Sequence, residues 1–127
     1  MWGNEKPFSD LVGKTLTKID NNGDELVFHC ADGAVYRMYH SQDCCESVSI
    51  EEIIGDITNL IGTPIIMADE STNSDNPKET SDESFTWTFY KFATVKGYVT
   101  IRWYGESNGY YSETVDFKKL TKTAKID

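Results

Sequence analysis

The first forty residues carry two turn signals between short stretches of alternating apolar and polar residues. Residues 16–19 alternate and end at an Asn-Asn-Gly-Asp turn (21–24), which favours a hairpin because Asn-Gly readily adopts positive φ. A second strand is expected over 25–31, an Asp-Gly turn over 32–33, and a third strand over 34–40. This pattern predicts a three-stranded antiparallel meander.

After residue 48 the apolar residues recur at helical rather than alternating spacing. Ser49 is followed three residues later by Glu52, as in a capping box, in which each side chain bonds a free backbone N–H at the helix start. Gly62 ends the pattern and Pro64 prevents its continuation. The apolar residues on the predicted stripe are Ile50, Ile53, Ile54, Ile57, Leu60 and Ile61. We therefore predict one amphipathic helix over residues 50–61, packed on a sheet.

The second half of the chain reads as further strands around one polar segment. Residues 64–68 are apolar and predict a strand, whereas 69–84 are polar and acidic and predict a mobile loop or a long hairpin tip. Aromatic residues occupy both faces of 85–94, which indicates a central strand. Strands over 98–104 and 110–117 would complete a second antiparallel meander.

The predicted fold class is therefore α+β. We expect an antiparallel β-sheet of about six to seven strands in two meanders, with one amphipathic helix packed on it. A chain of 127 residues has the usual size of one domain. Within this single domain (1–127) we expect an N-terminal extension over 1–10, the mobile acidic loop over 69–84 and a C-terminal tail over 118–127.

The net charge of the chain limits the classes of binding partner that we expect. The chain has 21 acidic and 12 basic residues, a net charge of −9. Such a balance repels nucleic-acid phosphates and anionic lipid surfaces, so neither nucleic acid nor a membrane is an expected partner. The charge suits either simple solubility or contact with a basic surface of another protein. No apolar run approaches the roughly 20 residues of a membrane span.

The cysteines bear on the compartment. The chain has three, Cys30, Cys44 and Cys45, and it opens on a polar segment rather than on a secretory leader. An odd number of cysteines without a leader fits free thiols in a reducing cytoplasm. We therefore expect a cytoplasmic protein.

A first candidate for chemistry is the short loop over 39–46. It brings His40 and the Asp43 carboxylate close to two thiols, and a histidine can activate a nearby cysteine such as Cys44. The adjacent cysteines fit neither a zinc knuckle nor a thioredoxin-type pair. The alternative is that these side chains are structural and only hold the connection between the preceding strand and the predicted helix in place.

A second candidate surrounds Arg102, one of two arginines beside ten lysines. An arginine flanked by aromatic rings can hold a phosphate or carboxylate while the rings stack on a base or sugar. The alternative is a self-contained cation–π stack. The other arginine, Arg37, shares a strand face with Tyr39, and if the two meanders pack together both arginines could converge near the 40–46 loop. The ligand contacts expected on this basis are Arg37, Tyr39, His40, Asp43, Arg102, Trp103, Tyr104, Asn108 and Tyr110.

The sequence lacks the common catalytic motifs. It has no Walker loop, nucleophile elbow, HExxH helix or dinucleotide-binding turn. Two histidines are too few to indicate a metal site, and no catalytic residues, metal or cofactor are predicted. An enzyme is therefore less expected than a binding protein.

Several strings resemble a small phage and prophage protein family of unknown function. They are YRMYHSQDCCESV (36–48), IGD (54–56), LIGTPI (60–65), GYVTIRWYG (97–105) and SNGYYSE (107–113). The resemblance extends from Leu11 to Phe117. The family carries no assigned activity, so no catalytic role is transferred.

The resemblance implies a setting in which a phage protein counters a host defence from the host cytoplasm. The first reading is sequestration of a small nucleotide-type ligand in an arginine and aromatic pocket. The second is an acidic inhibitor that docks directly on a host defence protein. A third is a small enzyme acting on a nucleotide signal through His40, Asp43 and Cys44. Exposed strand edges also make a homo-oligomer an expectation.

Overall fold

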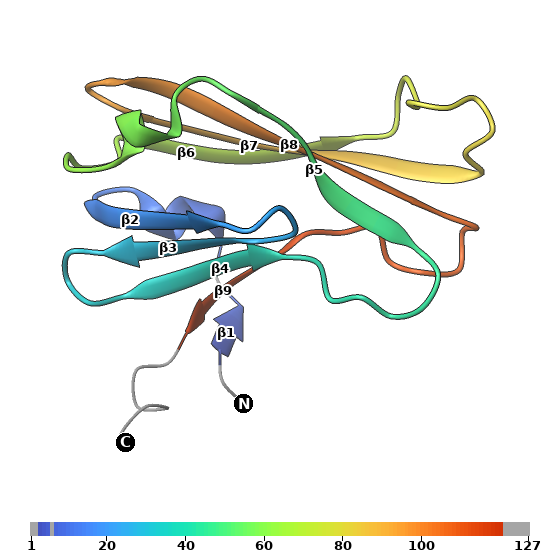
Figure 1. The fold of residues 1–127 in the computed structure, drawn as a ribbon, viewed down its shortest axis with the longest axis horizontal. Helices are drawn as coiled ribbons and strands as arrows, with labels where there is room; N and C mark the ends of the chain where they lie inside the picture. Colours follow the sequence, from blue (N-terminus) through green and yellow to red (C-terminus); the bar gives the residue numbers. More distant parts are fainter. Residues whose placement is uncertain (1–2, 6, 121–127) are drawn as a thin grey trace.

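The computed structural model describes residues 3–5 and 7–120 and arranges them in two antiparallel sheets that face each other (Figure 1). The first sheet has five strands, in the order β1 (Gly3–Glu5), β9 (Asp116–Leu120), β4 (Val35–Tyr39), β3 (Leu26–Cys30) and β2 (Leu16–Asn21). The second has four strands, in the order β5 (Ser47–Ile54), β8 (Gly97–Ser107), β7 (Ser84–Thr94) and β6 (Met67–Asn73). The architecture is a β-sandwich.

Apolar side chains from the inner faces of both sheets form one core. Phe8, in the 3₁₀ turn η1 (Phe8–Leu11), packs edge-on against Tyr90 of β7 and Phe117 of β9, with ring centroids 4.7 and 5.4 Å apart. Burial alternates along β3 and along the first half of β8, as expected for strands with one face on a core. The outward residues of each strand are thereby left on the two outer faces of the sandwich.

The first predicted meander is confirmed. Strands β2, β3 and β4 are consecutive antiparallel neighbours. The turn between β2 and β3 has Gly23 at φ +94°, and the Gly23 N–H donates to Asn21 Oδ1 at 2.9 Å. The Asn-Gly signal thus marks a real hairpin because glycine occupies the left-handed position that the turn requires.

The predicted amphipathic helix is wrong. Residues 47–54 form strand β5, and in the described part of the chain the only helical segments are the 3₁₀ turns η1 and η2 (Ile57–Leu60). A β-bulge between Ile50 and Glu52 adds one residue to β5. The apolar side chains of Val48, Ile50 and Ile53 therefore face the core at a spacing that imitates a helix. The fold class is accordingly mostly antiparallel β, not α+β.

The start of the predicted helix is absent as well. The residue that caps a helical turn is Asp56, whose side chain accepts from the Thr58 N–H at 3.0 Å, and not Ser49. Gly55, at φ +102°, separates β5 from η2. The predicted apolar stripe therefore spans two different elements, strand β5 and the 3₁₀ turn η2.

The second predicted meander is half right. Strands β7 and β8 pair antiparallel through eleven residue pairs and the turn before Gly97. The third strand, β9, instead crosses to the five-stranded sheet and pairs with β4 and β1. The chain thus connects the two sheets through the segment 108–115.

The segment over 69–84, predicted as a mobile loop or a long hairpin tip, begins as a strand. Residues 67–73 are β6, paired with β7 in continuous register, and only 74–83 form the connection. At the termini, residues 3–5 and 118–120 lie in β1 and β9, while the rest of the predicted tail, 121–127, lies outside the described residues. None of the helical segments among residues 3–5 and 7–120 is long or apolar enough to cross a membrane.

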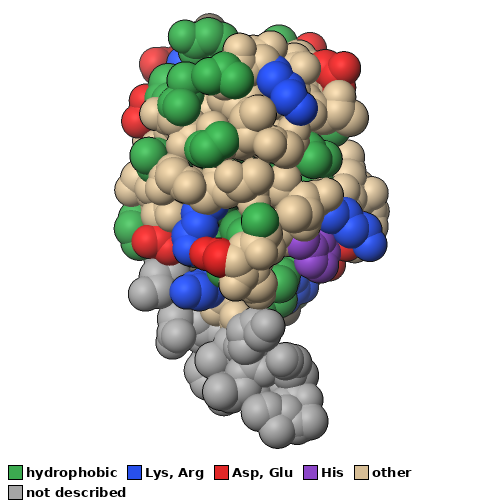
Figure 2. Space-filling view, turned by 90° about the vertical axis from the view of Figure 1, so that its left-hand side faces the viewer, with side chains coloured by type: hydrophobic (Ala, Val, Ile, Leu, Met, Phe, Trp, Pro, Cys, Tyr) green, Lys and Arg blue, Asp and Glu red, His purple; other side chains and the backbone are tan. Residues whose placement is uncertain are grey.

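Exposed apolar side chains mark one end of the sandwich. Val95 and Tyr98, at the turn between β7 and β8, are 77% and 72% exposed. The view onto this end shows hydrophobic side chains gathered toward its upper part, over the four-stranded sheet (Figure 2). This apolar end is distinct from the polar and aromatic outer face described next.

Candidate functional site

The outer face of the four-stranded sheet carries rows of directly opposite residues. The pairing places Arg102 between Glu52 on β5 and Phe89 on β7, and Phe89 next to Ser71 on β6. A second row runs from Tyr104 through Trp87 to Asn73, and a third from Ile54 through Thr100 and Lys91 to Asp69. The strand register therefore gathers an arginine, a lysine and several rings on one face.

Arg102 is held by two contacts from neighbouring strands. Its Nη1 donates to Glu52 in a short ion pair, and its guanidinium carbon lies 4.7 Å from the centre of the Trp87 ring. Trp87 is itself fixed, because its indole N–H donates to the Asn76 carbonyl at 2.9 Å. The Arg102 side chain remains 29% exposed. The guanidinium is thus oriented by its neighbours while still reaching solvent.

A groove of about 540 Å³ lies beside this arginine. We call it the Arg102 groove; its lining residues are Ile54, Ser71, Asn73, Phe89, Lys91, Thr100 and Arg102. A smaller hollow of about 150 Å³ adjoins it and shares Asn73, Phe89 and Arg102. The described residues that line the Arg102 groove include two cations and no carboxylate. In a protein with a net charge of −9, this is a surface suited to an anion.

The connection over 74–83 folds against the same face, where its Asp75 and Asn76 line the smaller hollow. The Tyr104 hydroxyl donates to Asp82 in a short hydrogen bond and accepts the Lys78 N–H at 3.1 Å. Burial, together with the Asp82 carboxylate, raises the pKa of Tyr104 to about 12. Lys78 Nζ also pairs with Glu51 on β5 at 2.6 Å. The part of the acidic segment that is a loop is therefore anchored at several points.

The first sequence candidate, His40, is a buried structural residue. Its Nδ1 lies 2.7 Å from the Thr114 carbonyl oxygen and its Nε2 lies 2.7 Å from Glu46 Oε2. The His40 and Glu46 side chains are 4% and 0% exposed. Each ring nitrogen therefore already has a hydrogen-bond partner inside the protein. His40 has no free nitrogen to take a proton from a substrate.

Glu46 organises the loop that precedes β5. Its carboxylate accepts the backbone N–H groups of Asp43 and Cys44 at 2.8 and 3.0 Å in addition to His40. Burial alone raises the pKa of Glu46, but these N–H donors and the imidazole outweigh it and lower the pKa to about 2. The loop is thus tied to a buried carboxylate that contacts the His40 ring, which supports the structural interpretation of the 39–46 segment.

The cysteines differ from the expectation of three free thiols. Cys44 and Cys45 form a disulfide between adjacent residues, whereas Cys30 is free and buried in β3. Burial raises the pKa of the Cys30 thiol. With Cys44 in a disulfide, it offers no thiolate to act as a nucleophile. The enzyme reading based on His40, Asp43 and Cys44 therefore loses its base and its nucleophile.

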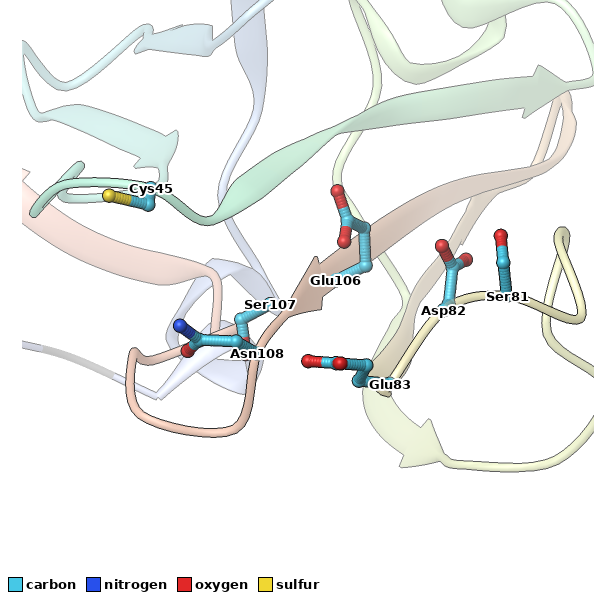
Figure 3. A pocket seen from close by; sticks show the side chains of 7 residues that line it. All are labelled: Cys45, Ser81, Asp82, Glu83, Glu106, Ser107 and Asn108. Atoms are coloured by element: carbon cyan, nitrogen blue, oxygen red, sulfur yellow. The ribbon is translucent and has the colours of Figure 1, made fainter.

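A second hollow, of about 300 Å³, lies between Cys45, the end of the 74–83 connection and the end of β8 (Figure 3). Its lining residues are Cys45, Ser81, Asp82, Glu83, Glu106, Ser107 and Asn108. Three carboxylates make this hollow unsuitable for an anionic ligand. Within the described residues no group of three or more metal-ligating side chains is placed to hold a metal ion.

The expected convergence of the two arginines does not occur. Arg37 lies on β4, where its guanidinium pairs with Glu25 at 2.6 Å and stacks on Tyr39 at 3.8 Å. That strand belongs to the five-stranded sheet, whereas Arg102 lies on β8 of the other sheet. Each arginine sits on a position that alternates with core residues, so the two guanidinium groups lie on opposite outer faces of the sandwich.

The other predicted contacts are scattered. Trp103 is fully buried, and its indole N–H donates to the Met38 sulfur at 3.4 Å, so it belongs to the core. Asp43 lies among the exposed loop residues 41–45. Asn108 lines the acidic hollow and Tyr110 is 86% exposed at the far end of β8. Of the predicted contacts, Arg102 and Tyr104 lie on the outer face that carries the groove.

The sequence reading missed the residues that β7 and β6 contribute to the groove. Phe89 and Lys91 face outward because they alternate with buried Tyr90 and Phe92. Counting back from the turn before Gly97 places Phe89 opposite Arg102, so the hairpin register held the necessary signal. Nothing in the sequence pattern indicated the pairing of β6.

The chain matches a protein family described as a domain of unknown function (DUF7448) over residues 9–117. Neither the comparison with curated proteins nor that with solved structures gave a match.

Proposed function

The chain belongs to the DUF7448 family, a family of unknown function, and we propose that it is a non-enzymatic binding protein that holds a small anionic, nucleotide-type ligand in the Arg102 groove. One observation carries the proposal: the described lining of the groove combines Arg102, Lys91 and the Phe89 ring without a carboxylate. The protein as a whole carries an excess of acidic residues. A cationic, aromatic groove on such a surface favours an anion with a planar ring.

The groove side chains can divide the recognition between them. Arg102 uses one nitrogen on Glu52 and keeps further N–H donors for a phosphate, which a planar guanidinium can bind through two oxygens. The exposed ammonium of Lys91 adds a second positive charge. Phe89 offers a ring on which a base can stack. Hydroxyl and amide groups of Ser71, Asn73 and Thr100 are available for the polar edges of such a ligand.

Binding without chemical change fits the rest of the structure. His40 is saturated by Thr114 and Glu46, and Cys44 is in a disulfide. The groove itself contains neither a histidine nor a carboxylate to act as a general base. In the phage setting that the resemblance implies, this activity would be sequestration of a host nucleotide signal.

The proposal is tested by calorimetric titration with a panel of a nucleoside monophosphate, a nucleoside diphosphate and a cyclic nucleotide. The variant Arg102→Gln is expected to weaken binding by about tenfold or more, since it removes a charged hydrogen bond to the ligand. The matched control is Arg37→Gln, which removes the other arginine from an equivalent ion pair and aromatic stack on the opposite sheet. Equal loss in both variants, or no binding to the wild-type protein, would contradict the proposal.

A second readout separates binding from catalysis. The bound nucleotide is released by denaturing the complex and weighed by mass spectrometry. Sequestration returns it intact, whereas a nucleotide of changed mass would show an enzyme.

A further inference from the structure

Strand β6 is an unusually regular sheet edge. It pairs with β7 over all seven residues without a register shift. The other sheet edges in the described part of the chain are interrupted or short: β5 and β2 each contain a register shift, and β1 has three residues. Bulges and short strands are devices by which proteins prevent an edge from pairing with another chain. In this part of the chain, β6 is the long edge without a bulge.

The outer half of β6 is also accessible. Asp69 to Asn73 are all exposed, whereas the turn η1 packs near the start of the strand. Residues 67–73 contain neither a lysine nor a proline, the two residue types that most often protect an edge. An edge strand presents a row of backbone N–H and C=O groups to a partner in its own plane. The accessible part of β6 can therefore hydrogen-bond with a further strand.

The charge of this region decides between possible occupants. Asp69 and Glu70 lie on β6, and the connection over 74–83 adds Asp75, Glu79, Asp82 and Glu83 against the single lysine Lys78. A second copy of this chain, paired antiparallel over the whole strand, would place Glu70 opposite its own counterpart. Like charges directly opposite each other destabilise a strand pair. A segment rich in lysine or arginine instead gains attraction at the end of the strand that carries Asp69.

We propose that β6 binds an extended basic segment of another protein by strand addition, extending the four-stranded sheet by one strand. Backbone hydrogen bonds to β6 supply affinity that does not depend on sequence, and the neighbouring carboxylates select for basic side chains. Outward side chains of the added strand lie beside Asp69, Ser71 and Asn73, and those of the opposite face lie beside Glu70 and Thr72. Ser71 and Asn73 also line the Arg102 groove, so this edge adjoins the surface proposed for ligand binding.

The probe is a ten-residue peptide of alternating lysine and valine, titrated into the full-length protein. Hydrogen exchange is expected to slow at alternate amides of residues 69–73 and to be unchanged in β2 at the edge of the other sheet. Binding should weaken steeply with salt. The matched peptide of alternating glutamate and valine should not bind. Absence of protection in 69–73, or protection centred elsewhere, overturns the proposal.

Two kinds of variant make the test specific. Asp69→Asn should weaken binding of the lysine peptide by about twofold to fivefold, while Asp24→Asn, the same change on an exposed turn of the other sheet, should leave it unaltered. Glu70→Pro and Ser71→Pro alter adjacent residues, whose N–H groups point to opposite sides of the strand. In one of the two variants proline removes an N–H that points toward β7, and this variant should have a lower Tm. In the other, proline removes an N–H that points away from β7, and this variant should keep the wild-type Tm but bind the peptide more weakly.

The same experiments distinguish self-association. Light scattering of the peptide-free protein should give the mass of one chain. A dimer that dissociates when proline replaces Glu70 or Ser71 would show that β6 pairs with a second copy, and would overturn the assignment of a basic segment.

Discussion

The Arg102 guanidinium lies 4.7 Å from the centre of the Trp87 ring and at the same time donates to Glu52 on the other side of its strand. Arg102 is thereby fixed by one residue of β7 and one of β5. A lysine in its place would keep the charge but could not present a planar group to both partners and to a ligand. This relationship explains how one arginine can be both part of the sheet surface and a binding group.

The variant Arg102→Lys is accordingly expected to weaken nucleotide binding by about tenfold, although the net charge is unchanged. Its Tm should stay close to that of the wild type, because a half-exposed ion pair adds little stability. Calorimetric titration beside a thermal melt checks both statements. Undiminished affinity in this variant would show that only the charge of Arg102 matters.

Removal of the Tyr104 hydroxyl should loosen the 74–83 connection without unfolding the domain. Tyr104→Phe loses the donor to Asp82 and the acceptor for the Lys78 N–H but keeps the ring packed against Trp87. Limited proteolysis should cut the variant faster within 74–83 than the wild type, with a similar Tm. The control is Tyr110→Phe, an exposed tyrosine outside this contact. An unchanged cleavage rate would contradict the anchoring.

The buried pair of His40 and Glu46 should make stability depend on acid. The Glu46 pKa falls from 4.5 to about 2 on folding, so its contribution is complete above pH 4.5 and is lost as the pH falls toward 2. Glu46→Gln should lower the Tm by several degrees at neutral pH and flatten the dependence of stability on pH in that window. Urea unfolding at a series of pH values measures it. A parallel decline of both proteins with pH would contradict the assignment.

Gly105 is expected to tolerate no side chain. A Cβ at this position would lie 2.8 Å from the Glu113 carbonyl oxygen and 3.1 Å from Val48 Cγ2, because the 108–115 crossing runs over β8 here. Gly105→Ala should therefore destabilise the protein by about 1–3 kcal/mol, measured by urea denaturation. Gly109→Ala, with open space around its Cβ, tests the steric argument, since its φ of +95° adds backbone strain without a clash. A smaller loss in Gly105→Ala than in Gly109→Ala would refute it.

Local signals in the sequence were sufficient for hairpins and insufficient for the assembly of the sheets. The turns at Gly23 and before Gly97 correctly predicted two antiparallel strand pairs, because the backbone conformation of a tight turn depends on only a few neighbouring residues. The helix prediction failed at the bulge after Ile50. One inserted residue shifts the two-residue repeat of apolar positions in the strand, so that their spacing resembles that of a helix. The pairing of β9 with β4 and β1 depends on contacts across the whole chain.

The residues of the candidate site were likewise predicted only in part from the sequence. Arg102 and Tyr104 were found because arginine is rare in this chain and is flanked by rings. Arg37 was placed with them only by assuming that the meanders converge, whereas the strands that carry the two arginines belong to different sheets. His40 and Asp43 were predicted as functional residues because the sequence of a short polar loop does not show whether its side chains are already hydrogen-bonded within the protein. The hydrogen bonds of Glu46 settle that question for His40.

Nuclear magnetic resonance mapping of the nucleotide panel on the wild-type protein tests the central claim most directly. The account predicts shift changes in the Arg102 side chain, the Phe89 ring and the amides around Ser71 and Lys91, with residues 35–39 on the opposite sheet unaffected. Shifts centred on Arg37 and Tyr39, or none with any nucleotide of the panel, would contradict it.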